Sequence, residues 1–195
     1  MSNFIENLKT RFSARGFDSS KKISDSDLEE IIEVFRLSPS MLNVQPWKIF
    51  VIKDENTKKE LQKYSADQDQ VGINSHFLVL ARKNQVDDLH LQKVAKGEPK
   101  REKIKNFLNN MSESQKTEWA VSQVSIALGN VIAFLADKKI DSCPIGIFDR
   151  EKYDEILGLK EKGYSSVFNI AIGYSTDTNI SPKDRLNRED IVEFL

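Results

Sequence analysis

The sequence predicts an α+β fold in a single domain, residues 1–195. Helical segments and three or four strand-like segments follow one another without the strict β–α alternation of a doubly wound parallel sheet. The length of 195 residues fits one domain of ordinary size. The formal net charge of -1 gives no overall field that favours nucleic acid or an anionic membrane, so neither is expected as a partner.

Two helices are predicted before the first strand. Residues 2–10 suit a short N-terminal helix. A second helix should begin at Ser24, because Asp27 three residues later gives a start similar to a capping box, and it should end before Pro39. Its apolar face repeats at helical spacing and consists of Leu28, Ile31, Ile32 and Phe35.

Two strands are predicted next, with a helix between them. Residues 47–52 indicate a strand that starts at Trp47, and residues 56–64 indicate a charged helix. Residues 76–82 are apolar almost without interruption, which is typical of a strand that is buried on both faces. We therefore expect this second strand to be central in the sheet.

Residues 84–111 differ in composition from the rest of the chain. They are rich in Lys, Asp, Glu and Asn and have few apolar positions that could form a core. We expect a variable, solvated helical excursion that is the most mobile part of the fold.

The strongest predicted helix covers residues 112–139 and starts with the capping pattern Ser112-x-x-Gln115. Apolar residues lie almost all round it, which predicts burial on most sides, as in a core or dimer-interface helix. They are Ile126, Ala127, Leu128, Val131, Ile132, Phe134 and Leu135. Later segments predict a short helix over 150–157, a turn at Lys162-Gly163, a strand over 165–174 and a C-terminal arm over 176–195.

The single cysteine and the two histidines indicate no catalytic or metal site. Cys143 excludes an internal disulfide, suits a reducing cytoplasm and is interpreted as a small buried side chain. His76 is expected in the core or at a sheet edge, and His90 at the solvated surface. No cluster has metal-ligand spacing, and no glycine-rich nucleotide fingerprint occurs. Without a signal-peptide-like start, and with 126–136 too short to span a bilayer, the chain is interpreted as soluble and cytoplasmic.

Two cationic motifs lie near opposite ends of the chain. Arg11, Ser13 and Arg15 alternate, so in an extended segment they would present two cations and a hydroxyl to one anion or one polar ring edge. Lys183 and Arg185 repeat this spacing near the C-terminus. Taken alone, each motif is more typical of solvated surface charge than of a binding site.

A third motif covers residues 38–47 and contains two prolines that fix the backbone. Ser40 and Asn43 offer short donors and acceptors to a ligand, and Trp47 covers apolar surface where the strand begins. The alternative is a loop that only ends a helix and anchors a tryptophan.

These three motifs in this order, with residues 160–164 before a strand that ends at Gly173, resemble the nitroreductase family of FMN-dependent oxidoreductases, and most closely its oxygen-insensitive branch. The resemblance covers essentially the whole chain. It implies a sandwich with a central, mostly antiparallel sheet flanked by helices, in an intertwined homodimer. A long helix would form the interface, C-terminal arms would reach around the partner, and FMN would lie between the subunits.

The resemblance also implies roles for individual residues. Arg11, Lys183 and Arg185 look like ligands of the FMN phosphate, with Ser13 beside them. Arg15 looks like a contact to the flavin pyrimidine edge or to the phosphate side. The partner subunit would supply Pro39, Ser40 and Asn43.

Two further segments are similar to the family but depart from its pattern. Gln70 retains an amide near the expected flavin pyrimidine, whereas Asp67 replaces the usual Asn and should be solvated or turned away from a reduced flavin. A loop over the flavin face would present a backbone N–H to flavin N5, and Ile147 replaces a glycine that is often found there. This loop contains Pro144, Ile145, Gly146 and Ile147.

The function implied by the resemblance is hydride transfer from NAD(P)H through flavin N5 to a nitroaromatic, quinone or similar acceptor, by a ping-pong mechanism. No side chain is expected to be catalytic, since the chemistry belongs to FMN. Residues 84–111 would tune the choice of acceptor. The alternatives are another reductase or flavin-consuming activity on the same scaffold, or a flavin-binding store or regulator without relevant turnover.

Overall fold

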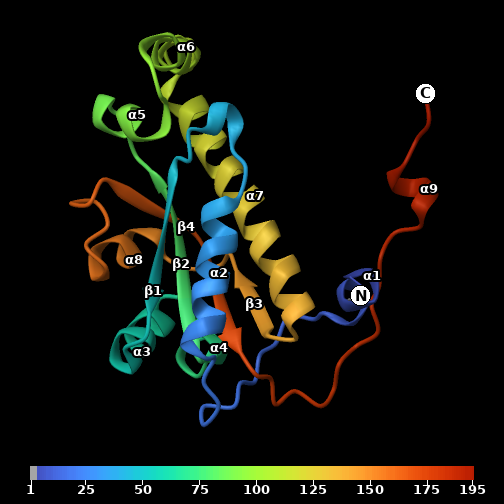
Figure 1. Ribbon diagram of the computed structural model, residues 1–195. Coiled ribbons are helices and arrows are strands. Elements are labelled where there is room, and N and C mark those ends of the chain that lie inside the picture. Colours follow the sequence, from blue (N-terminus) through green and yellow to red (C-terminus); the bar gives the residue numbers. More distant parts are fainter. Residues whose placement is uncertain (1–3) are drawn as a thin grey trace.

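The computed structural model describes residues 4–195 as a four-stranded sheet covered by helices on both faces (Figure 1). The strands are β1 (Trp47–Ile52), β2 (His76–Lys83), β3 (Asp141–Ile145) and β4 (Tyr164–Gly173). Their order is β1-β2-β4-β3, and every neighbouring pair is antiparallel. The α+β prediction and the antiparallel sheet are confirmed.

The β2 strand is internal, as its continuous apolar run predicted. Successive side chains of a strand point to opposite faces. Accordingly Leu78 and Leu80 join one buried cluster while Phe77 and Val79 join another. Pro144 lies in β3, an edge strand, where a residue without an N–H is tolerated.

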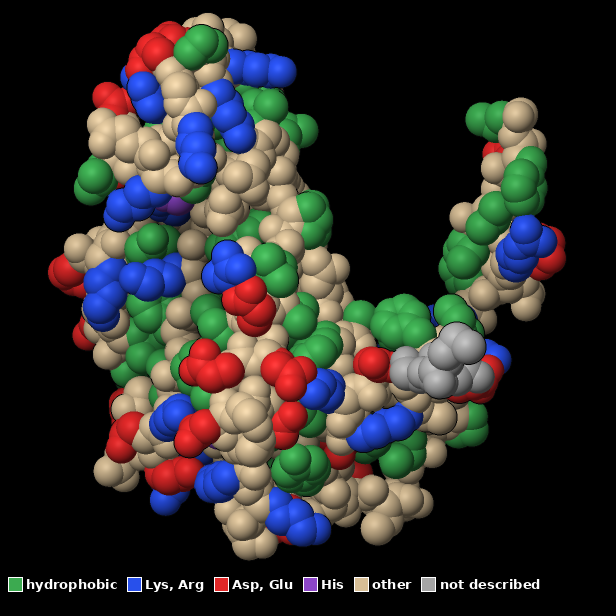
Figure 2. Space-filling view, in the orientation of Figure 1, with side chains coloured by type: hydrophobic (Ala, Val, Ile, Leu, Met, Phe, Trp, Pro, Cys, Tyr) green, Lys and Arg blue, Asp and Glu red, His purple; other side chains and the backbone are tan. Residues whose placement is uncertain are grey.

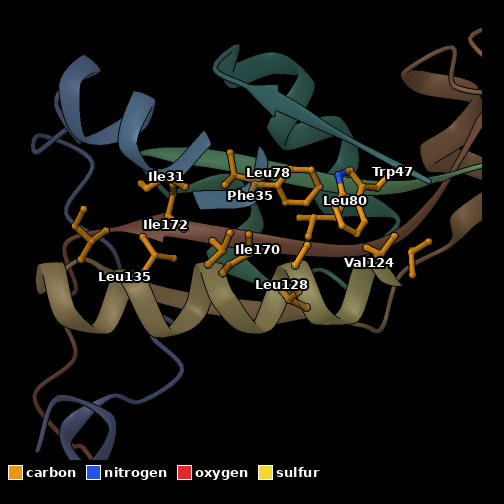
Figure 3. Close-up of a cluster of buried hydrophobic side chains, with 14 of the residues drawn as sticks. Ile31, Phe35, Trp47, Leu78, Leu80, Val124, Leu128, Leu135, Ile170 and Ile172 are labelled. Carbon is orange, nitrogen blue, oxygen red and sulfur yellow. The ribbon is translucent and has the colours of Figure 1, made fainter. Parts of the chain in front are cut away.

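One face of the sheet is covered by α2 (Asp25–Leu37) and α7 (Glu113–Lys138). Figure 3 shows side chains of both helices meeting those of the sheet, among them Phe35, Leu128 and Leu135. Both predicted N-caps are confirmed: the side chain of Ser24 accepts the Asp27 N–H, and Ser112 forms a complete capping box with Gln115.

The opposite face is covered by shorter helices. These are α3 (Glu55–Lys63), α4 (Asp69–Gly72) and α8 (Arg150–Ile156). Fully buried Tyr153 of α8 lies in this layer, with its ring centroid 4.6 Å from that of Phe148 and its hydroxyl 2.5 Å from Ser65 Oγ. His76 and Cys143 are buried, as predicted.

Residues 84–111 are helical and mostly exposed, as predicted, but they also contribute to a small core that the prediction did not include. The segment forms α5 (Asp88–Val94) and α6 (Glu98–Asn109), and both helices bury apolar side chains against Trp119 at the start of α7. The buried residues are Leu91, Ala95, Ile104 and Leu108. His90 is not a solvated surface residue: it is half-buried, and its Nε2 lies 2.7 Å from the carbonyl oxygen of Val44.

The N-terminal segment and the first part of the C-terminal arm lie beside each other near the C-terminal end of α7 (Figure 1). The N-terminal helix α1 covers Phe4–Thr10, and residues 2 and 3 of the predicted helix lie outside the described residues. The arm after β4 leaves the body of the molecule and contains only α9 (Arg188–Ile191) (Figures 1 and 2). Several apolar side chains on it are exposed, namely Ile180, Leu186, Ile191, Val192, Phe194 and Leu195.

The helix α7 is less buried in one protomer than its composition predicted. One side packs on the sheet, but Ile126 is 44% exposed, and small or polar residues lie exposed near it, namely Ser122, Ser125, Gly129 and Asn130. By length and composition α7 could also cross a membrane, although half of its most apolar window is buried inside the fold. A core helix of a soluble protein passes the same test, so this is weak evidence for a membrane span.

Candidate functional site

The segment that carries Arg11, Ser13 and Arg15 lies against the edge of the sheet. The Ala14 N–H donates to the Ser142 carbonyl oxygen at 3.1 Å, and Ser13 forms a parallel bridge with Ser142. Ala14 is fully buried, whereas its neighbours Ser13 and Arg15 are exposed. The alternation inferred from the sequence is therefore present in the fold.

The C-terminal arm brings the second pair of cations to the first. Lys183 Nζ donates to the carbonyl oxygen of Arg11, and Arg11 and Arg185 line a common groove of about 630 Å³ with Lys183. Burial lowers the pKa of Lys183, and the charges of Arg11 and Arg185 lower it further. Cations gathered in this way repel one another, so the groove favours an anion.

A second group of predicted residues lies next to the first. Gln68 Nε2 donates to the carbonyl oxygen of Ile147 at 3.1 Å, and Gln70 Nε2 lies 3.9 Å from Cys143 Sγ. These contacts place residues 67–70 beside 143–147. Gln70 is buried, whereas Asp67 is exposed.

Cys143 links the two groups without serving as a nucleophile. Burial raises the pKa of the Cys143 thiol, while the positive charges of Arg15 and Arg11 act in the opposite direction. The net upward shift keeps the thiol protonated at neutral pH. Its role is therefore to fill space beneath the polar groups.

The end of β3 supplies an exposed backbone segment near these side chains. Ile145 is buried, whereas Gly146 and Ile147 are exposed, Ile147 by 75%. No backbone atom would contact a Cβ added at Gly146, so the segment is open to a ligand on that side.

Residues 39–43 form a separate turn between α2 and β1. The loop is a 3₁₀ turn, Met41–Asn43, in which Leu42 and Asn43 have positive φ angles of 52° and 59°. Ser40 Oγ accepts the Gln45 N–H at 2.9 Å, which holds the turn together. Pro39 and Asn43 are exposed.

One protomer does not bring this turn to the cationic groove. The turn attaches to α7 where the Met41 N–H donates to Gln123 Oε1 at 2.8 Å. The N-terminal helix attaches much further along α7, where Asn7 Nδ2 donates to Asp137 Oδ1 at 2.9 Å. At 1.5 Å per helical residue, the two attachment points lie about 20 Å apart along the helix axis.

Two polar residues of this region had no signal in the sequence motifs. Gln68 joins the segment 67–70 to the segment 143–147. The Asp177 carboxylate accepts the backbone N–H groups of Arg15 and Gly16, 162 and 161 residues away in the sequence. The glycine directly after the R-x-S-x-R motif was the one local indication of such a close approach.

Comparison with known proteins gives the same family over nearly the whole chain. A family model described as the nitroreductase family matches residues 8–174. The major NAD(P)H-flavin oxidoreductase of Aliivibrio fischeri is 32% identical, with 98% of each chain covered. The oxygen-insensitive NAD(P)H nitroreductase of Salmonella typhimurium is 31% identical, with 92% of this chain and 93% of that protein covered.

Solved structures agree on the fold. A structure from Exiguobacterium sibiricum, determined in complex with FMN, superposes with a TM-score of 0.84 at 24% identity, covering 100% of this chain and 98% of that one. The strand order, the long helix and the arm thus belong to a known architecture. On the family match and the two sequence relatives together, this chain is a member of the nitroreductase family.

Proposed function

We propose that this protein is an FMN-dependent oxidoreductase that takes hydride from NAD(P)H and passes it to a small acceptor such as a nitroaromatic or a quinone. The observation that carries the proposal is the groove lined by Arg11, Lys183 and Arg185, in which these three cations outnumber the neighbouring acid Asp184. A phosphate monoester is the anion that such a cluster suits best. The names of the relatives and the FMN in the Exiguobacterium sibiricum structure support the same reading.

The residues present fit FMN. Arg11, Ser13, Lys183 and Arg185 would hold the phosphate, and Arg15 would lie at the pyrimidine edge or beside the phosphate. Gln70 would donate to the pyrimidine after its amide, which donates to Gln68 Oε1 at 3.0 Å, exchanges that partner. The backbone near Gly146 would meet N5. When bound, FMN supplies the hydride-accepting and hydride-donating chemistry. The protein's own contribution is orientation and donors that stabilise negative charge at the N1–O2 edge.

A complete site requires a second copy of the chain. The exposed stripe of α7 runs from Ser122 to Asn130, and Asn130 lies midway between the attachment points at Gln123 and Asp137. A two-fold axis that crosses α7 near Asn130 would place the partner subunit's Ser40 and the partner subunit's Asn43 against this protomer's cationic groove. It would also cover Ile126 and give the apolar arm a surface to pack on.

The arrangement also accounts for one site serving both half-reactions. No acid, base or nucleophile among the site residues is needed, since Cys143 stays protonated and the remaining contacts are hydrogen bonds and cations. NAD(P)H and the acceptor would occupy the same open side in turn, which gives ping-pong kinetics. The cytoplasm, with its supply of NAD(P)H, is the compartment that this chemistry fits.

The test begins with the absorbance spectrum of the purified protein. We expect a yellow protein, or stoichiometric uptake of FMN, with FMN bound more tightly than FAD because the clamped phosphate leaves no room for an adenylate. Anaerobic addition of NADH or NADPH should bleach the flavin at a catalytic rate, and an acceptor should restore the colour. A colourless protein that does not quench FMN fluorescence would refute the proposal, whereas bound flavin that neither nicotinamide reduces would identify a store.

A further inference from the structure

The N-terminal loop and the beginning of the arm form a short antiparallel pair beyond the sheet. The Asp18 N–H donates to the Tyr174 carbonyl oxygen at 2.9 Å, and the Thr176 N–H donates to the Gly16 carbonyl oxygen at 3.1 Å. Phe17 and Ser175 form the bridge between these two bonds. The pairing places the R-x-S-x-R motif next to the residues where the arm turns away.

Asp177 closes this pair with its side chain. Its Oδ2 accepts the Arg15 N–H at 2.7 Å, and its Oδ1 accepts the Gly16 N–H at 2.9 Å. The Asp177 N–H in turn donates to Ser175 Oγ at 3.0 Å, and Ser175 Oγ donates to the Gly16 carbonyl oxygen at 3.1 Å. One half-buried carboxylate thus fixes two consecutive backbone groups of the motif.

The close approach depends on the glycine. A Cβ added at Gly16 would lie 2.6 Å from Thr176 Oγ1 and 2.9 Å from Asp177 Oδ1, both shorter than real Cβ contacts. A side chain at this position would force the Thr176 and Asp177 side chains to move and would disturb the hydrogen bond from the Gly16 N–H to Asp177. The residue type at position 16 and the carboxylate at 177 therefore belong to one arrangement.

Besides the backbone pair and Ser175, two charged side chains attach the arm to the motif. Asp177 binds at Arg15 and Gly16, and Lys183 binds at the carbonyl oxygen of Arg11. Grooves of about 380 and 630 Å³ lie along this stretch, and both are walled by the loop on one side and by the arm on the other. A shift of the arm would separate Lys183 and Arg185 from Arg11.

We infer that Asp177 is a positioning residue that sets the register of the C-terminal arm against the N-terminal loop and so assembles the phosphate clamp from its two halves. This inference rests on the proposed function, in which the clamp binds the FMN phosphate. For the loss of Asp177, this role predicts the opposite change in anion affinity from the one that charge alone predicts. Removing an acid beside an anion site should tighten anion binding by electrostatics, whereas loss of the register should weaken it.

The test compares FMN with riboflavin, which lacks the phosphate, in the wild type and in Asp177→Asn and Asp177→Ala. We expect Asp177→Ala to weaken FMN binding about tenfold or more, in line with the loss of charge-assisted hydrogen bonds, and to change riboflavin binding by less than about twofold. Asp177→Asn retains one acceptor oxygen and should fall between wild type and alanine. The matched control is Asp190→Asn, which removes the same charge from an exposed position of the same arm outside both grooves and should leave FMN binding unchanged.

The outcomes separate this inference from the proposed function. A wild type that binds riboflavin as tightly as FMN would refute the phosphate clamp itself. A wild-type preference for FMN that persists in both Asp177 variants, or that increases in Asp177→Asn, would overturn the positioning role. Equal losses for the two flavins would also overturn it, because they indicate general damage to the fold. Should Asp177→Ala fail to fold, Asp177→Asn alone carries the same comparison.

Discussion

At the scale of single residues, the arm cations Lys183 and Arg185 should affect FMN binding without affecting the stability of the fold. Lys183 and Arg185 are exposed, so truncation to alanine leaves no cavity and should change stability little. Each substitution removes a charge-assisted contact worth about 1.5–3 kcal/mol, so each should weaken FMN binding roughly ten- to a hundredfold. Fluorescence titration measures this affinity, and sedimentation should find the dimer unchanged.

Salt and a control variant make that prediction sharper. Raised salt should weaken FMN binding in the wild type more than in the Lys183→Ala, Arg185→Ala double variant, because part of the screened attraction is already absent. Lys160→Ala removes an exposed cation outside the groove and should have no effect. Unchanged FMN affinity in the double variant would show that the arm cations are only solvated surface charges.

Tyr153 predicts a pH dependence of stability that is unrelated to flavin binding. Burial raises the pKa of this phenol from 10.0 to about 12, although Ser65 acts in the opposite direction. The folded state therefore holds the proton after the unfolded chain has released it. This contribution is fully present below pH 10 and is lost as the pH rises from about 10 to 12, at a cost of roughly 2–3 kcal/mol.

The Tyr153→Phe variant isolates that effect. Denaturant unfolding at a series of pH values should show a smaller fall in unfolding free energy between pH 10 and 12 for the variant than for the wild type. At pH 8 the variant should be less stable by about 1 kcal/mol, since the hydrogen bond to Ser65 is lost. Parallel curves for the two proteins would contradict the raised pKa.

At the scale of elements, the sequence was informative wherever the signal was local. The caps at Ser24 and Ser112 depend on residues three positions apart, and both are present. The apolar run of β2 predicted its internal place because burial on both faces leaves no polar alternation.

The same reasoning missed the small core at residues 84–111, because the many charges there drew attention away from a few buried apolar positions. Many of the charges there pair one helical turn apart or between the two helices, as in Glu98 with Arg101 and Asp88 with Lys105. Such pairs leave the opposite side of each helix free to pack, so a small number of apolar positions forms a core. The role of Asp177 was inaccessible for another reason: its partners are more than 160 residues away.

The exposed stripe of α7 gives a prediction about the dimer. In one protomer nothing lies within 4 Å of a Cβ added at Gly129, so a side chain there fits the isolated fold. If the partner's α7 packs on this stripe, Gly129→Glu should place a charge in the interface and separate the subunits. Asn56→Glu, which adds the same charge at an exposed position of α3, is the control and should remain dimeric.

Sedimentation and FMN titration together test this assignment. The Gly129→Glu protein should be monomeric and folded and should bind FMN much more weakly than wild type, because each site then lacks the partner's turn. A dimeric Gly129→Glu protein would place the interface elsewhere. A monomer with full FMN occupancy would show that one protomer holds a complete site.

At the scale of the whole molecule, the decisive feature is that the two halves of the proposed site lie about 20 Å apart along α7 in one protomer. Sharing across a two-fold axis gives a result that no single-chain site can give. Consider one subunit that lacks the clamp through Lys183→Ala and Arg185→Ala, and a second that lacks the turn through Ser40→Ala and Asn43→Ala. Each homodimer has two defective sites and should bind FMN weakly.

A heterodimer of these two subunits should recover one site. If each site combines the clamp of one subunit with the turn of the other, both defects fall on the same site. The second site then has an intact clamp and an intact turn, so a purified heterodimer should bind about half as much FMN as wild type. If each subunit builds its own site, both sites of the heterodimer carry one defect and nothing is recovered. Co-expression with two different affinity tags yields the heterodimer, and its flavin content and rate of NAD(P)H oxidation measure the outcome. Recovery of one high-affinity site per heterodimer, with the second site remaining weak, is the result that a shared site requires.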